Sequence, residues 1–263
     1  MTMSRFLPPE SESAVATRLR SAGSVFAEDE ARLLTSAAPT RTALDDMVKR
    51  RVAGEPLEYI LGWTEFCGMR ITVEPGVFVP RRRTEFLVSR AATLCQPGSV
   101  VVDVCCGSGA VGAALLAAAP GIELYATDID PAAVRCASRN LPSRNARVLQ
   151  GDLFEPLPSN IHGRVAVIVA NAPYVPTGEI RMMPPEARLY ETRIALDGGA
   201  AGVDVHRRLA AEAAGWLAPG SSILVETSAA QAELTAGLFA DAGLRPRVLH
   251  SPAHDATVIL AEL

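Results

Sequence analysis

One tetrapeptide is suited to binding a planar nitrogen group: Asn171-Ala172-Pro173-Tyr174. It follows the apolar, mostly β-branched run 165–170, which is typical of a strand buried on both faces of a parallel sheet. Open α/β sheets bind ligands at the carboxyl ends of such strands. Pro173 has no backbone donor and restricts Ala172 to extended conformations. The Asn171 side-chain oxygen and the Ala172 carbonyl are therefore expected to accept two hydrogen bonds from one amide or amine, beside Tyr174. Taken alone, the tetrapeptide is equally typical of a strand that simply ends in a turn formed by Asn and Pro.

A second candidate site is a glycine-containing loop, 105–109, between an expected strand, 100–104, and an expected helix, 110–119. Glycines let the backbone approach a ligand, and free amides at a helix start attract negative groups. The loop does not have the Gly-x-Gly-x-x-Gly spacing of a dinucleotide site, because Cys105 stands where the first glycine would be. The loop alone does not identify a ligand.

Acidic residues end the next two expected strands. Asp128 follows strand 122–127 and lies 19 residues beyond Gly109, about where a ribose diol is held. Asp152 follows the third strand, 147–150, and is placed to approach an adenine amino group. Each acid alone could be a helix cap or a turn residue. Together with the loop, they predict an adenosine pocket on three successive strand ends.

The order Asp103-x-x-x-Gly107-x-Gly109, then Asp128, then Gly151-Asp152 resembles the S-adenosylmethionine site of class I methyltransferases. The tetrapeptide at Asn171 is similar to the Asn-Pro-Pro-Tyr motif of members that methylate planar amino or amide nitrogens. The resemblance implies a Rossmann-like α/β fold. Its seven-stranded sheet is expected to be mostly parallel, with an antiparallel last strand.

Three further stretches, 55–62, 78–85 and 195–204, resemble the HemK-type protein-(glutamine-N5) methyltransferases. These enzymes modify the catalytic glutamine of peptide release factors. The resemblance covers nearly everything from residue 54 onward, and it implies methyl transfer from S-adenosylmethionine to a glutamine side-chain amide of a release factor. It assigns catalysis to Asn171, Ala172, Pro173 and Tyr174. It assigns cofactor binding to Asp103, Cys105, Cys106, Gly107, Ser108, Gly109, Asp128, Asp152, Leu153 and Asn171.

The chain departs from the family pattern at several positions. Cys105 replaces the first glycine of the loop, and Ala172 replaces the first proline of the Asn-Pro-Pro-Tyr motif. Arg82-Arg83 replaces the Pro-Glu pair that usually follows the linker arginine. Leu153 stands where an aromatic residue is common. Two alternatives therefore stay open. One is a methyltransferase acting on an exocyclic amino group of a nucleobase, and the other is a cofactor-binding relative without activity.

The pattern along the chain predicts three parts. Residues 1–61 are predicted to form a helical, substrate-recognising domain, with Thr40 capping its third helix. Residues 62–80 are predicted to form a β-hairpin linker. Residues 81–263 alternate strands and helices and form the methyltransferase domain, beginning with a helix for which Thr84 is the expected cap. The segment 175–197 is predicted to be a long loop.

Composition limits the other function classes. A net charge of -4 and a pI near 5.7 argue against stable nucleic-acid binding. Five cysteines without a Cys-x-x-Cys pair indicate reduced thiols rather than a disulfide framework or a zinc site. No signal-peptide pattern or membrane span is evident. We expect a cytoplasmic monomer that binds no metal and no membrane.

Overall fold

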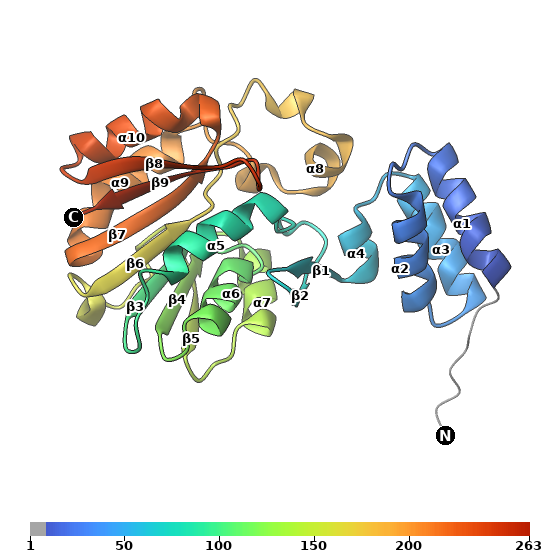
Figure 1. The fold of residues 1–263 in the computed structure, drawn as a ribbon, viewed down its shortest axis with the longest axis horizontal. Helices are drawn as coiled ribbons and strands as arrows, with labels where there is room; N and C mark the ends of the chain where they lie inside the picture. Colours follow the sequence, from blue (N-terminus) through green and yellow to red (C-terminus); the bar gives the residue numbers. More distant parts are fainter. Residues whose placement is uncertain (1–8) are drawn as a thin grey trace.

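The N-terminal part of the molecule is helical and lies beside a larger sheet domain (Figure 1). The computed structural model describes residues 9–263. The first helices are α1 (Pro9–Ser21), α2 (Ala27–Ala37), α3 (Arg41–Val52) and α4 (Leu57–Leu61). Leu19, Leu34 and Val48 share one buried cluster. The predicted cap of α3 is confirmed, because Thr40 Oγ1 accepts a hydrogen bond from the Ala43 amide at 3.1 Å.

A short hairpin connects the helices to the sheet domain, as predicted. Its strands are β1 (Trp63–Phe66) and β2 (Met69–Thr72), which pair antiparallel. Asn140 fixes the hairpin in place: its side chain exchanges two hydrogen bonds of 2.9 Å with the Thr72 backbone. The Asn140 amide also donates to the Ser108 carbonyl at 2.9 Å, so the linker is held against the glycine loop.

The sheet has seven strands in the order β5-β4-β3-β6-β7-β9-β8. Their bounds are β3 (Val100–Val104), β4 (Glu123–Asp128), β5 (Ala146–Gln150), β6 (Val165–Ala170), β7 (Leu217–Thr227), β8 (Arg245–Ser251) and β9 (Ala256–Glu262). Strands β3 to β7 pair parallel, and β9 runs antiparallel to both of its neighbours. The predicted fold class is therefore confirmed.

Helices cover both faces of the sheet (Figure 1). The main ones are α5 (Glu85–Ala92), α6 (Ala110–Ala118), α7 (Pro131–Asn140), α9 (Asp204–Trp216) and α10 (Ala232–Asp241). Side chains of α5, α6 and α7 cluster with Val101 and Val167, whereas those of α9 and α10 cluster with Val102 and Ile168. The central strands are buried on both faces, which explains their unbroken apolar runs. Within the described chain, no helix is long and apolar enough to cross a membrane.

The segment 175–197, predicted as a loop, contains three short helical turns. These are η3 (Ile180–Met182), α8 (Pro185–Tyr190) and η4 (Arg193–Ala195). The other 3-10 turns are η1 (Arg82–Thr84), η2 (Ser159–Ile161) and η5 (Ala229–Gln231). Glu191, just after α8, anchors the segment: its Oε1 accepts from Arg81 Nη2 at 2.5 Å and from the Val79 amide at 3.2 Å.

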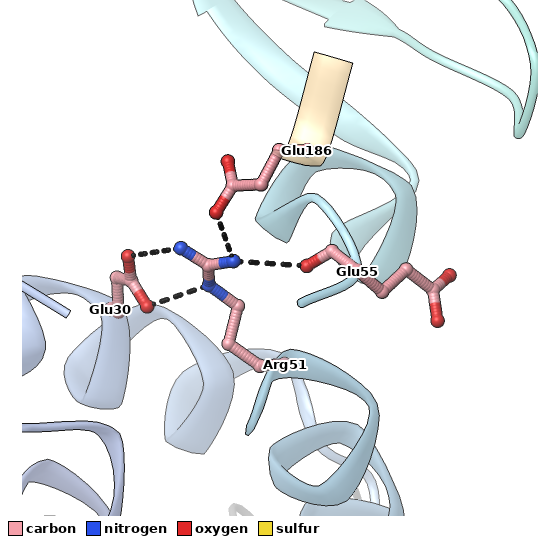
Figure 2. Close-up of polar contacts among 4 residues, drawn as sticks. All are labelled: Glu30, Arg51, Glu55 and Glu186. Atoms are coloured by element: carbon pink, nitrogen blue, oxygen red, sulfur yellow. Dashed lines mark hydrogen bonds and ion pairs between the residues drawn. The ribbon is translucent and has the colours of Figure 1, made fainter. Parts of the chain in front are cut away.

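Arg51 of α3 joins the helical part to this segment (Figure 2). Its guanidinium donates to both oxygens of Glu30 in α2, at 2.8 and 2.9 Å. It also donates to Glu186 of α8 at 2.5 Å and to the Glu55 carbonyl at 3.1 Å. Because the Arg51 and Glu30 side chains are only 12% and 11% exposed, this pairing is shielded from solvent.

Candidate active site

A cavity of about 240 Å³ opens at the carboxyl ends of β3, β4, β5 and β6. This is the edge of the sheet at which α/β folds bind ligands. Most of the predicted cofactor-binding residues line it: Asp103, Cys105, Cys106, Gly107, Ser108, Asp128, Asp152, Leu153 and Asn171. The structure thus brings the loop, both acids, and Asn171 and Pro173 of the tetrapeptide to one place.

Gly109 is the predicted cofactor residue that does not line the cavity. It has φ +75°, and a Cβ there would lie 3.1 Å from the Ala137 Cβ and 3.2 Å from the Ala137 Cα of α7. The turn into α6 and the close helix packing both require this glycine, and a contact with the cofactor stays a prediction.

The glycine loop is fixed by Asp128. One carboxylate oxygen accepts from the Gly107 amide at 2.8 Å and the other from the Asp130 amide at 2.9 Å. Cys105 has φ +57°, so a non-glycine residue occupies the left-handed region at the start of the loop. Burial raises the pKa of its thiol, which keeps the Cys105 side chain neutral.

Asp103 places a second carboxyl group on the cavity wall. Its Oδ2 accepts from the Gly112 amide at 2.9 Å, and the residue is only 1% exposed. Burial raises the pKa of Asp103 to about 7. A buried carboxyl group that is costly to ionise is suited to receive a cationic ligand group, which would stabilise the ionised form.

Asp152 has a partner that the sequence did not indicate. Its Oδ2 accepts from Arg208 Nη2 of α9 at 2.7 Å, and both residues line the cavity. The contact joins positions 56 residues apart, and nothing in the helical pattern around Arg208 distinguishes it from a solvated arginine. The adenine contact expected of Asp152 stays a prediction.

The Asn171 side chain is oriented by Thr84. Asn171 Nδ2 donates to Thr84 Oγ1 at 3.2 Å, and Asn171 lines the cavity. The predicted cap role of Thr84 is wrong: it has helical backbone angles and makes no cap hydrogen bond with α5. Because its amide nitrogen is engaged, Asn171 has its side-chain oxygen left to accept a hydrogen bond from a ligand.

Tyr174 is not among the cavity-lining residues. Its hydroxyl donates to Glu226 Oε1 at 3.1 Å, and its ring lies 6.4 Å, centroid to centroid, from that of His206. Burial raises the pKa of the Tyr174 hydroxyl, which stays protonated as a donor. Pro173 lines the cavity, and Ala172 is buried beside it. A direct substrate contact by Tyr174 stays a prediction.

Glu226, at the end of β7, was missed by sequence reasoning. It is 1% exposed, its Oε1 accepts from the Tyr174 hydroxyl at 3.1 Å, and Arg83 Nε lies 3.8 Å from the same atom. Burial raises the pKa of Glu226. The one available signal was a charged residue that ends the apolar run 223–225.

Two segments outside the core motifs complete the wall of the cavity. The linker contributes Phe66, Gly76, Val77, Phe78 and Pro80, and the segment 175–197 contributes Thr192, Ile194 and Ala195. Burial raises the pKa of Glu191, which holds these two segments together through Arg81 and Val79.

Comparisons with known proteins agree with this geometry. The family model for the methyltransferase small domain matches residues 68–235. A release factor glutamine methyltransferase of Geobacter sulfurreducens is 40% identical over 199 residues, which cover 75% of this chain and 69% of that protein. A 4-amino-L-phenylalanine/4-methylamino-L-phenylalanine methyltransferase of Streptomyces pristinaespiralis is 34% identical over 203 residues, covering 74% and 69% of the two chains.

Solved structures share the fold. A methyltransferase from Pyrococcus furiosus superposes with a TM-score of 0.55 at 17% identity, over 74% of this chain and 88% of that one. A 16S rRNA N2 G1207 methyltransferase from T. thermophilus, in complex with AdoMet and guanosine, gives a TM-score of 0.53 at 22% identity, over 76% and 49% of the two chains. At these identities, the likeness establishes the architecture.

Proposed function

Because the chain belongs to the release factor glutamine methyltransferase family of class I methyltransferases, we propose that it methylates a glutamine side-chain amide in a peptide chain release factor. The observation that carries this proposal is the Asn171 amide, whose nitrogen is held by Thr84 so that its oxygen is left to accept from a substrate N–H in the cavity. S-adenosylmethionine is the cofactor.

The cavity fits this cofactor chemically. Asp103 and Asp128 are carboxyl groups suited to a cationic group and to a ribose diol, respectively. The Gly107 amide is already engaged by Asp128, so it is not free to bind a phosphate group. When bound, the cofactor supplies an electrophilic methyl group.

The protein's own contribution to the reaction is positioning. An amide nitrogen is a poor nucleophile because its lone pair is delocalised into the carbonyl group. The Asn171 side-chain oxygen and the Ala172 carbonyl each accept one N–H and aim that nitrogen. Both hydrogen bonds strengthen as positive charge develops on the nitrogen, so they favour the transition state over the ground state. Positioning of this kind supplies about 7–11 kcal/mol in favourable cases.

We assign substrate recognition to the helical part and keep the three-part division 1–61, 62–80 and 81–263. The family model begins at residue 68, so the helices lie outside the conserved methyltransferase unit. Arg51 attaches them to α8, whose segment forms part of the cavity wall. The acting form is a cytoplasmic monomer with reduced thiols; all five cysteines are free.

A labelling experiment tests the proposal. The protein is incubated with methyl-labelled S-adenosylmethionine and one of three acceptors: a recombinant release factor, ribosomal RNA or 4-amino-L-phenylalanine. We expect label in the release factor, and none when its glutamine at the catalytic centre is replaced. Label in the free amino acid, which the Streptomyces relative's name makes the second candidate, or in RNA would overturn the assignment of substrate.

A further inference from the structure

Among the described residues that line the cavity, Arg208 alone carries a positive charge. The same wall holds four carboxyl groups, those of Asp103, Asp128, Asp130 and Asp152. Arg208 pairs with one of them, through the 2.7 Å contact between its Nη2 and Asp152 Oδ2. This hydrogen bond raises the pKa of Arg208, so the guanidinium stays charged. The contact therefore distinguishes Asp152 from the other acids of the cavity.

The pair is too open to solvent for a purely structural role. The side chains of Arg208 and Asp152 are 50% and 37% exposed, and ion pairs of this kind contribute little to folding stability. The backbone of Arg208 is nevertheless fixed, because the next residue of α9, Leu209, is fully buried in the core. Val205, one turn earlier on α9, also lines the cavity. A well-packed helix thus presents the ion pair where a ligand can reach it.

One oxygen of Asp152 is left for a ligand. Its Oδ2 accepts from Arg208, whereas its Oδ1 accepts no hydrogen bond from any residue that the structure describes. A carboxylate oxygen can only accept, so Oδ1 is suited to the N–H of an amino group. The apolar side chains of Leu153 and Val205 line the same cavity. A hydrogen-bond acceptor among apolar side chains suits a flat ring that carries an amino group, as adenine does.

We propose that Arg208 is a positioning residue that holds the Asp152 carboxylate toward the base of the cofactor, so that the site prefers adenine to a 6-oxo base. Asp152 Oδ1 accepts from the amino group of adenine, but it has no hydrogen to offer the oxygen that hypoxanthine carries at that position. Without Arg208, the partly exposed carboxylate is free to turn toward solvent, and the preference falls. This inference rests on the proposed function through the cofactor alone, not through the methyl acceptor.

The ratio of two dissociation constants tests the inference. S-adenosylhomocysteine, which is the cofactor without its methyl group, and S-inosylhomocysteine differ only in the base, and calorimetry with the full chain gives the Kd of each. We expect the wild type to bind the adenine compound about 10- to 100-fold more tightly, the range for one hydrogen bond to a charged group. Arg208→Met is expected to lower this ratio about 5- to 10-fold. Arg208→Lys keeps a cation beside Asp152 and is expected to keep most of the preference.

Two further variants separate positioning from other effects of the arginine. Arg207→Met is the matched control, because it removes the same charge one residue earlier, from an exposed side chain that does not line the cavity. It is expected to leave the ratio unchanged. Asp152→Asn offers both a donor and an acceptor, so its ratio is expected to lie near one. Adding Arg208→Met to Asp152→Asn is expected to change the ratio no further, because no carboxylate is left to position.

Four results would overturn the inference. They are equal binding of the two compounds by the wild type, a preference that survives in Arg208→Met, an equal loss in Arg207→Met, and a further loss in the double variant. The last would assign Arg208 a contact of its own with the base. A general loss of structure weakens both compounds alike and cancels in the ratio. Failure to label a release factor would instead overturn the proposed function, and neither dissociation constant depends on that acceptor.

Discussion

At the scale of single residues, the polarity of the cavity groups decides what the site can bind. Asp103 and Asp128 offer carboxylates, and Asn171 offers an amide oxygen. These groups accept hydrogen bonds and attract cations. These groups are therefore suited to a cofactor with a positive charge and hydroxyl groups, and to a substrate that carries N–H groups.

Asp103 makes cofactor binding depend on pH. Burial raises its pKa to about 7, so at pH 6 it is mostly protonated and at pH 8 mostly ionised. Only the ionised form attracts the cationic part of the cofactor. We expect the Kd for S-adenosylmethionine, measured by calorimetry, to decrease as the pH rises from about 6 to 8.

Asp103→Asn is the control for that prediction. It cannot ionise, so its Kd is expected to be higher and nearly independent of pH in the same range. A pH dependence that persists in Asp103→Asn would assign the titration to another group.

At the scale of elements, the glycine loop is shaped by helix packing as much as by its ligand. Gly109, directly before α6, lies in the left-handed region, and Leu141 and Ala137 lie within about 3 Å of where its Cβ would be. Asn140, at the end of α7, binds the Ser108 carbonyl and the hairpin. The loop therefore keeps its shape only while α6, α7 and the hairpin stay packed.

Gly109→Ala is expected to destabilise the protein by about 2–4 kcal/mol, from left-handed strain plus the close contact with Ala137. Chemical denaturation gives the free energy of unfolding. Gly163→Ala is the matched control, because φ is +70° there but no atom lies within 4 Å of the new Cβ. Its cost is expected to be about 1 kcal/mol. Equal losses in the two variants would show that packing against α7 does not matter.

Local patterns were enough to predict most elements but not the long-range contacts. The β-branched runs at 100–104 and 165–170 predicted buried strands, and these are confirmed as β3 and β6. The sequence predicts a helix cap at Thr84 because a cap is a local feature. The structure instead pairs Thr84 with Asn171, which lies 87 residues away. The six-residue helix α8 is too short for a clear helical period.

At the scale of the whole molecule, one arginine connects the helical part to the cavity wall. Arg51 binds Glu186 in α8 (Figure 2). Glu191, directly after α8, accepts hydrogen bonds from Val79 in the linker and from Arg81 just after it. Thr192 and Ile194 then line the cavity. The position of the helices is thus linked to the shape of the site through a short series of polar contacts.

Arg51→Met is expected to destabilise the protein by about 3 kcal/mol, because Glu30 is left buried without its cation. Hydrogen exchange is expected to become faster in peptides that cover 185–197. Arg50→Met is the control, since Arg50 pairs with Glu55 at a more exposed position. It is expected to cost about 0–1 kcal/mol and to leave that exchange unchanged. Equal exchange rates in both variants would contradict the connection.

The central claim is that the Asn171 amide aims the substrate nitrogen, and Asn171→Asp tests it most directly. The carboxylate cannot donate to Thr84 Oγ1 as the amide nitrogen does. Measured with a release factor as acceptor, kcat is expected to fall by about 100-fold or more, by analogy with the loss of one preorganised hydrogen bond in other enzymes. The Kd for S-adenosylmethionine, measured on the same preparation, is expected to change little. Methylation by Asn171→Asp at the wild-type rate would contradict the account.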